Sequence, residues 1–184
     1  DMKTGFSLAI VVQKKGPIGY AGASMRYFLE QLGHSHLILR GDGENALQSL
    51  LRAAKESVSA TIKVDIQASP PGSHASIGGA EKFHDTLASQ VRTLLHRVES
   101  RSGIVIAPTA TMFPWAIRHA SYRLSRFHLR ACGTTSFHAA TGNQVKVKLA
   151  EFGETVHCKL AEINSVGKSQ PRWYKGTWVG ISDA

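Results

Sequence analysis

Two acidic residues, Asp42 and Glu81, stand where an α/β chain places ligand-binding groups. Asp42 closely follows the apolar stretch HLIL, in the sequence RGDGE, and Glu81 begins a long helical pattern. A strand end and the start of a later helix can meet at one edge of an open sheet, where such folds bind ligands. Two carboxylates at one edge need a cation to neutralise them, and their hard oxygens suit Mg²⁺ or Mn²⁺.

Each residue also has an ordinary structural interpretation. An Asp after a strand can accept a hydrogen bond from a free N–H of the next helix. A Glu in the first turn of a helix is favoured by the helix dipole. Taken singly, Asp42 and Glu81 fit these roles best. Taken together they fit a two-metal site, with ions about 3.5–4 Å apart, of the kind that cleaves and joins phosphodiester bonds.

The net charge of +9 on this 184-residue chain is concentrated in one segment. Residues 82–148 carry 10 Lys and Arg against 2 Asp and Glu. Residues 1–81 carry 8 against 7, and residues 149–184 carry 4 against 4. Such a segment is expected of a protein that binds a polyanion such as nucleic acid, and equally of one whose basic surface only maintains solubility.

The candidate nucleic-acid contacts are the basic and histidine side chains Lys82, His84, Arg92, Arg118 and Arg126. One face of a predicted helix joins two of these arginines to Trp115, His119 and Tyr122. Such a face can hold a phosphate backbone through charge and aromatic stacking. It can equally be buried against the C-terminal segment.

Several classes of protein are excluded or disfavoured. No apolar run is long enough for a transmembrane helix, and residues 5–12 are too short and lack a signal-peptide cleavage pattern. Cys132 and Cys158 form no close pair, and His34 and His36 have no CxxC partner, so neither a zinc module nor a disulfide framework is indicated. A reducing compartment fits this cysteine usage.

Hydrophobic periodicity predicts an α/β domain with a small β-rich C-terminal segment. Strands are predicted over residues 6–12, 36–40 and 60–67. Helices are predicted over residues 20–33, 44–56 and 113–127, and from the loop at 69–79 to about residue 99. The core stripe of the long helix is Phe83, Leu87, Val91, Leu94 and Val98.

From residue 144 onward the pattern becomes β-like, in QVKVKLAEFG, TVHCKLAEI and RWYKGTWVGI. Trp173 and Trp178 are predicted to be core residues of this segment. We therefore expect a domain over residues 1–142 and a small β-rich tail over residues 143–184.

The stretch GSHASIGGAEKFHDTLASQVRTL, residues 72–94, resembles the part of retrotransposon and retroviral integrases that carries the catalytic glutamate. The matching residues are Ser76, Gly78, Glu81 and Lys82. LILRGDGENAL resembles the strand that ends in the family's second catalytic Asp, and DMKTGFSLAIVV resembles its second strand. FGETVHCKL and RWYKGTWVGI resemble the segment downstream of retroelement integrase cores. The resemblance covers essentially the whole chain and is strongest over residues 36–98.

The resemblance implies an RNase H-like mixed sheet flanked by helices, in a fragment of a Pol-type polyprotein. It implies that Asp42 and Glu81 are catalytic and hold Mg²⁺ or Mn²⁺, and that Lys82 contacts DNA phosphates. In the family, a metal-activated water cleaves near a DNA 3′ end, and the freed 3′-OH then attacks target DNA. The resemblance implies a homo-oligomer that acts on the DNA ends of the element and on target DNA. It implies a nuclear protein, with an earlier cytoplasmic phase in a retroelement particle. It implies no membrane partner.

Two departures from the family pattern affect the expected activity. Asp42 is followed by Gly43-Glu44, where the family commonly has Asn-Gly. The family's first catalytic Asp lies on the strand before the one that opens this chain, and Asp1 is not assigned that role. We expect the first strand to be absent, so that the chain holds two of three carboxylates and is inactive alone. The alternatives are a non-catalytic, decayed or co-opted binding domain of the same fold, and a nuclease that does not join strands.

Overall fold

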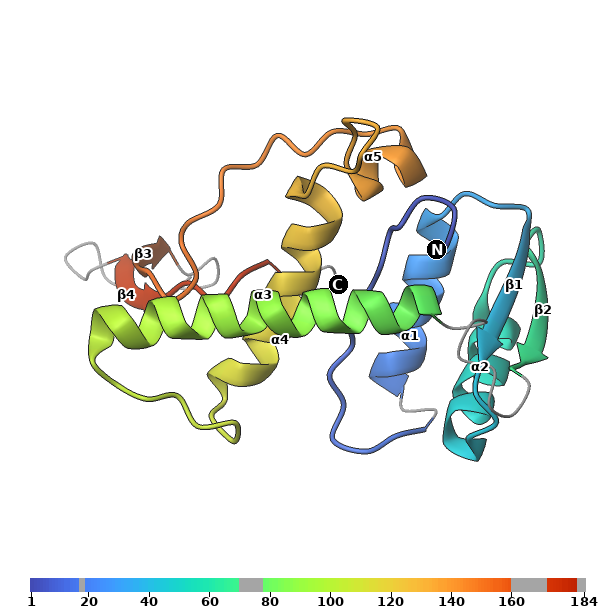
Figure 1. Ribbon diagram of the computed structural model, residues 1–184, viewed down its shortest axis with the longest axis horizontal. Helices are drawn as coiled ribbons and strands as arrows, with labels where there is room; N and C mark the ends of the chain where they lie inside the picture. The colour runs from blue at the N-terminus through green and yellow to red at the C-terminus, as the bar shows by residue number, and fades with distance from the viewer. Residues whose placement is uncertain (17–18, 70–77, 160–171, 182–184) are drawn as a thin grey trace.

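The computed structural model of the chain describes residues 1–16, 19–69, 78–159 and 172–181 (Figure 1). The elements are α1 (Gly19–Gln31), β1 (His36–Gly41), α2 (Asn45–Ser57), β2 (Lys63–Ala68), α3 (Gly78–Ser102), α4 (Met112–Phe127), α5 (Ser136–Thr141), β3 (Thr155–Lys159) and β4 (Trp173–Thr177). The predicted α/β class is confirmed. Most of the predicted loop at 69–79, with His74 and Ser76 of the integrase-like stretch, falls outside the described residues.

Strands β1 and β2 pair in parallel, with Leu37 opposite Val64 and Gly41 opposite Ala68. Because parallel neighbours need a crossover connection, α2 joins them. Leu37 and Val64 are buried on the same side of the pair, and Leu51 and Ala54 of α2 are also buried. In the described part of the chain this parallel pair and the antiparallel pair β3–β4 are separate sheets. The predicted single mixed sheet is therefore not seen among these residues.

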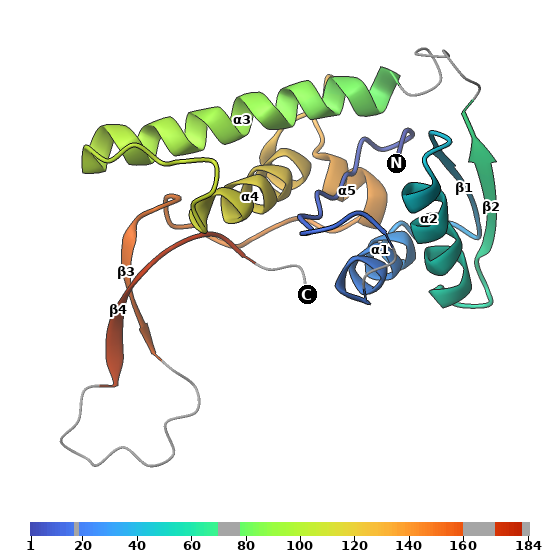
Figure 2. The ribbon, with the colours of Figure 1, turned by 90° about the horizontal axis from the view of Figure 1, so that it is seen from below.

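Two apolar clusters hold the described residues together. The first joins α1, the β1–α2–β2 unit and the N-terminal segment, through Phe6, Leu29, Leu32, Leu37, Ala54 and Val64. The second joins α3 and α4, which pack across each other (Figures 1 and 2). Four of the five predicted stripe residues of α3 are buried in it, and Phe83 packs against it. The long helix and its core face are therefore confirmed.

The predicted strand over residues 6–12 is wrong, because the structure has no strand there. Phe6 is buried between aromatic rings, with ring centroids 5.2 Å from Phe28 and 5.7 Å from Phe137. The Ser7 carbonyl accepts a hydrogen bond from the Ser125 hydroxyl of α4. Side-chain packing between helices therefore fixes this apolar segment, which its composition and the preceding turn had suggested to be a strand.

The C-terminal residues form an antiparallel ribbon, β3–β4, that projects from the helical body (Figure 2). Two predictions for this region are wrong. Residues 144–153 include no strand, and Trp173 is 60% exposed, so it is not a core residue. Phe152 is buried in the α3–α4 cluster, which ties the start of the predicted tail to the helices. Among the described helices, none is both long and apolar enough to cross a membrane.

Candidate functional site

Asp42 lies just beyond the carboxyl end of β1 and closes the turn into α2. Its Oδ1 accepts a hydrogen bond from the Glu44 backbone N–H at 3.1 Å, and its carbonyl accepts one from Gln48 Nε2 at 2.6 Å. Glu44 is the N-cap residue of α2, so Asp42 supports the helix start in the manner of a capping turn. Asp42 therefore stabilises the turn into α2, but its side chain accepts from the N-cap residue and not from an N–H of the first helical turn, and it remains exposed.

The positively charged side chain of Lys15 lies near this turn. Lys15 Nζ pairs with Glu44 at 2.8 Å, with the Lys15 side chain largely exposed and the Glu44 side chain partly exposed. The hydrogen bond and charge of Glu44 raise the pKa of the Lys15 ammonium, and the charge of Asp42 contributes a smaller part. Two acidic side chains and one ammonium therefore share the turn after β1.

The glycine before Asp42 lets α2 pack closely on the end of β1. Gly41 is buried, and a Cβ at this position would come within 2.9 Å of Leu47 Cδ2 and 3.3 Å of Leu51 Cδ1. The start of α2 therefore packs directly on the backbone at the end of β1. This contact fixes the direction in which the chain leaves the sheet and carries Asp42 into solvent.

Glu81 lies in the first turn of α3 and is exposed. The Ser69 N–H donates to the Gly41 carbonyl at 2.7 Å, so the chain leaves β2 at the same sheet edge as Asp42. In Figure 2 both strands point toward the side on which α3 begins. Asp42 therefore lies at the sheet edge from which the chain continues toward α3 and Glu81, and the connection through residues 70–77 is outside the described part. Close approach of the two carboxylates stays a prediction.

No third ligand joins these two within the part of the chain that the structure describes. No group of three or more His, Cys, Asp or Glu side chains suited to a metal ion occurs there. The oxygen donors of Asp42 and Glu81 have the right chemistry for Mg²⁺ or Mn²⁺. As a set of two, with Asp42 hydrogen-bonded to backbone, they do not make a complete metal site.

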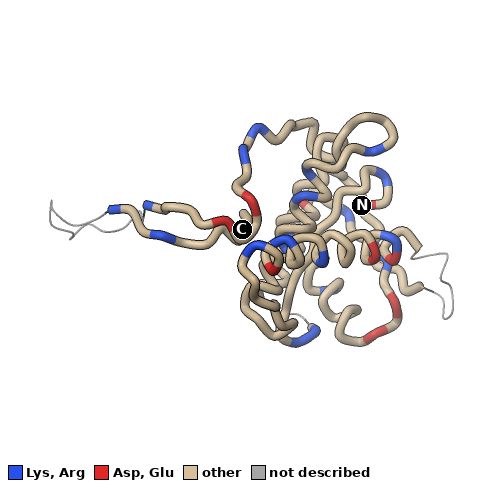
Figure 3. The backbone as a smooth tube through the Cα atoms, turned by 60° about the vertical axis from the view of Figure 1, so that its left-hand side comes forward, with Lys and Arg blue, Asp and Glu red and all other residues tan. Residues whose placement is uncertain are grey.

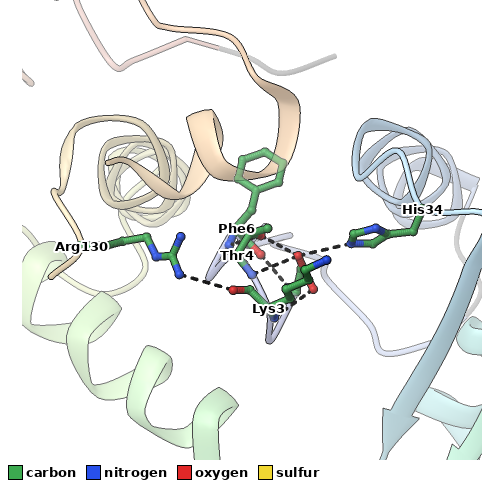
Figure 4. A network of polar contacts seen from close by, with 6 residues as sticks. Lys3, Thr4, Phe6, His34 and Arg130 are labelled. Atoms are coloured by element: carbon green, nitrogen blue, oxygen red, sulfur yellow. Dashed lines mark hydrogen bonds and ion pairs between the residues drawn. The ribbon is translucent and has the colours of Figure 1, made fainter. Parts of the chain in front are cut away.

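Asp1 serves the N-terminal turn. Its carboxylate accepts hydrogen bonds from Thr4 and Lys3 and lies 3.5 Å from His34 Nε2, in the network shown in Figure 4. The Asp1 nitrogen donates to the Phe6 carbonyl at 2.7 Å. These bonds give Asp1 a structural role in the N-terminal turn.

Of the histidines considered as zinc ligands, His34 lies beside this turn and His36 lies on β1. His36 Nε2 is 2.7 Å from Asp65 Oδ2 on the neighbouring strand. That hydrogen bond, aided by Lys63, lowers the pKa of the Asp65 carboxyl. His34 therefore lies in the connection between α1 and β1, and His36 lies on β1.

Three predicted nucleic-acid contacts, Lys82, His84 and Arg92, are exposed on α3. Lys82 lies on the face opposite the buried Val91, because nine residues make two and a half turns. Lys82 and Arg92 are separated by about 15 Å along the helix axis. This exposed part of α3 stays the predicted contact surface for a phosphate backbone.

The two predicted contacts on α4, Arg118 and Arg126, are differently placed. The Arg118 guanidinium lies 5.0 Å from the Trp115 ring centroid and 5.8 Å from that of Tyr20, and the residue is half-buried. Arg126 is only 8% exposed. The prediction that Arg126 lies on an open DNA-contact surface is wrong, because the N-terminal segment, including Phe6, covers this face of α4.

His119, on the same predicted face, is also buried. It is 2% exposed and stacks on Phe152 with ring centroids 5.4 Å apart. Its Nδ1 has no hydrogen-bond partner in the structure and faces Gly180. Burial, together with the charge of Arg123, lowers the pKa of His119 to about 4. His119 is therefore neutral at pH 7.

Sequence reasoning missed two groups of basic residues. Arg97 and Arg123 line a cavity of about 460 Å³ between α3, α4 and residues 149–152. The others lie on the projecting ribbon, where Lys159, Arg172 and Lys175 are exposed. The balanced charge total of residues 149–184 concealed the ribbon group. A strand-by-strand count would have found it, because neither strand contains an acidic residue (Figure 3).

Comparisons of the chain with protein-family models, with curated proteins and with solved structures found no match.

Proposed function

We propose that this chain is the core of a retroelement integrase, an RNase H-like domain that binds DNA and supplies Asp42 and Glu81 for DNA 3′-end processing and strand transfer. The observation that carries the proposal is the order β1–Asp42–α2–β2–Glu81. A parallel pair of strands has one acidic residue at its carboxyl edge and another in the first turn of the next helix. The integrase-like stretch LILRGDGENAL spans β1, Asp42 and the start of α2, and the described part of the stretch at residues 72–94 lies on α3.

The acidic pair and the basic surface have separate roles in this proposal. When bound, Mg²⁺ or Mn²⁺ would supply Lewis-acid activation of a water or a 3′-OH. Asp42 and Glu81 would be two of its ligands, with the third outside the set that the described residues provide. Exposed Lys82 and Arg92 on α3 would hold the DNA backbone, giving binding that weakens as salt rises.

A second candidate function is a non-catalytic DNA-binding domain of the same origin. One observation favours it: the side chain of Asp42 is used in the turn before α2. Both candidates predict DNA binding. They differ in whether Asp42 and Glu81 together bind a divalent cation.

The first test measures duplex DNA binding against KCl concentration. Replacing Lys82 and Arg92 with Glu should reduce the slope of log affinity against log salt by about 1.8, on the basis of 0.9 per phosphate contact. The matched control is Lys14→Glu with Lys63→Glu, an equal charge change at exposed positions outside the basic segment. Equal effects of the two pairs would show that net charge, and not the α3 surface, drives binding, and would count against the proposal.

The second test measures Mn²⁺ binding to the DNA-bound chain by electron paramagnetic resonance. The integrase proposal expects bound Mn²⁺ that is lost in both Asp42→Asn and Glu81→Gln, with DNA affinity unchanged within about twofold. Glu44→Gln is the control, because Glu44 lies in the same turn but is paired with Lys15. Mn²⁺ binding indifferent to Asp42 and Glu81 would favour the non-catalytic domain.

A further inference from the structure

The β3–β4 ribbon stands clear of the helical body, as Figures 2 and 3 show from two directions. Its register places Lys159 opposite Trp173 and His157 opposite Lys175. Directly paired residues of an antiparallel ribbon share a face, and so do residues two apart on one strand. His157, Lys159, Trp173 and Lys175 therefore form one continuous face, which we call the ribbon face.

Every side chain of the ribbon face is exposed. Trp173 is 60% exposed, although an indole ring is among the most favourable groups to bury. The adjacent residue Tyr174 belongs to the opposite face, where it pairs with Cys158. Trp173 is therefore the aromatic side chain of the ribbon face, with a lysine directly opposite and another two residues away.

The charge of the ribbon has one sign. Lys159, Lys175 and the adjoining Arg172 are basic, and β3 and β4 contain no Asp or Glu. Figure 3 shows the acidic positions at the base of the ribbon and the basic ones along its strands. At the base, Glu151 is held by Arg97 at 2.7 Å and lies 3.5 Å from Arg101. This separation favours a polyanionic ligand along the strands.

An exposed indole beside two ammonium groups is complementary to an unpaired nucleotide, which offers the flat face of its base and the negative charge of its phosphate. A nucleic-acid base stacks on an aromatic ring whatever its sequence, and the flanking phosphates pair with lysine. Bases inside a duplex are stacked on one another and offer no free face. The ribbon face is therefore better suited to a single strand than to a duplex.

We propose that the ribbon face binds single-stranded nucleic acid, with a base stacked on Trp173 and the neighbouring phosphates held by Lys159 and Lys175. Nucleic acid as the class of partner rests on the proposed function. The ribbon face is a surface separate from α3, and its ligand is single-stranded where that of α3 is duplex DNA. The duplex surface on α3 and the ribbon face then hold different parts of one DNA substrate.

The experiment measures binding of the full 184-residue chain to a fluorescein-labelled 20-nucleotide single strand and to the matching duplex, by anisotropy. Trp173→Ala should weaken single-strand binding about 5- to 150-fold, the loss of one stacked base. Trp173→Phe should retain most of the affinity. Tyr174→Ala is the control, because it removes an exposed aromatic ring from the opposite face, and it should change binding less than about twofold.

Lysine replacement tests the phosphate contacts. Lys159→Gln with Lys175→Gln should lower the salt slope for the single strand by about 1.4, on the basis of 0.7 per contact, and leave the duplex slope unchanged. Equal losses for Trp173→Ala and Tyr174→Ala, or no loss for either, would overturn the ribbon proposal. Duplex binding that still depends on Lys82 and Arg92 in that case would leave the proposed function standing.

Discussion

The guanidinium carbon of Arg126 lies 4.2 Å from the centre of the Tyr122 ring, one helical turn earlier on α4. The ring centroids of Phe137 and Phe6 lie 4.7 Å and 5.6 Å from the same carbon. A cation enclosed by three aromatic faces is stabilised by their quadrupoles, more strongly where water is excluded. Arg126 thus joins α4 to the N-terminal segment and to α5.

Replacing Arg126 should therefore destabilise the fold. We expect Arg126→Ala to lower the free energy of unfolding by about 2–4 kcal/mol, through lost stacking and lost packing. Arg126→Lys should also cost about 1 kcal/mol or more, because an ammonium lacks the planar stacking surface. Urea denaturation measures both. Arg92→Ala on exposed α3 should stay within about 0.5 kcal/mol. A fully stable Arg126→Lys protein would show that charge alone matters at this position.

Stability should depend on pH through His119. Its pKa is about 4 in the folded protein, whereas an unfolded histidine titrates near 6.5. The unfolded chain therefore takes up the proton first as pH falls, and stability is lost between about pH 6.5 and pH 4. We expect a loss on the order of 2 kcal/mol across this window.

The measurement is the free energy of unfolding at pH 7, 5.5 and 4.5, for the wild type and for His119→Leu. The leucine variant should be less stable at pH 7, because it loses the stacking on Phe152. Its stability should fall less steeply with acidification. Parallel curves for the two proteins would assign the acid sensitivity to carboxylates elsewhere.

Gly153 is expected to tolerate no side chain. Its φ is +76°, and a Cβ there would overlap Val98 of α3. Gly133 has a similar φ of +78° but nothing within 4 Å of such a Cβ. Gly133→Ala should cost about 1–2 kcal/mol for the backbone conformation alone. Gly153→Ala should cost about 2 kcal/mol more, measured by thermal and urea unfolding, because Val98 must move. Equal losses would mean that α3 yields easily at Val98.

Asp42 should matter for local stability before it matters for chemistry. Asp42→Ala removes the acceptor of the Glu44 N–H bond, so we expect a loss of about 1 kcal/mol. Asp42→Asn keeps a side-chain oxygen and should cost less than half of that. Urea denaturation separates the two variants. A similar loss for Asn and Ala would show that the negative charge, facing Lys15, stabilises the turn.

The parts of the fold that the sequence predicts well are those decided by local pattern. The stripe on α3 repeats over many turns, so Leu87, Val91, Leu94 and Val98 are correctly placed. Gly41 and Asp42 mark the end of β1 because glycine and aspartate disfavour strand continuation and form turns. Local chemistry is sufficient for such elements.

Long-range packing decides the rest. Residues 6–12 have the apolar composition of a short strand, but Phe6 is held by rings from α1 and α5, which no local pattern reveals. Arginine is usually found on protein surfaces, but Arg126 is buried by the same N-terminal segment. The prediction for Trp173 is wrong in the opposite direction. Its apolar ring suggested a core position, but the ribbon leaves it exposed to solvent. Each error concerns contacts between residues distant in the sequence.

The burial of Phe152 limits where the C-terminal part of this chain could be removed or exchanged by recombination. Phe152 is 2% exposed and stacks on His119, while Glu151 beside it binds Arg97, so the turn at 151–154 completes the α3–α4 layer. A break before residue 151 would leave an open apolar socket between the two helices. A break after Glu154 would remove the projecting ribbon and also Val179, which packs against the same cluster, and Gly180, which lies against His119. Chain segments on both sides of the ribbon therefore contact the α3–α4 layer, so only the part between residues 155 and 177 could be exchanged for a ribbon from another protein without rebuilding the core.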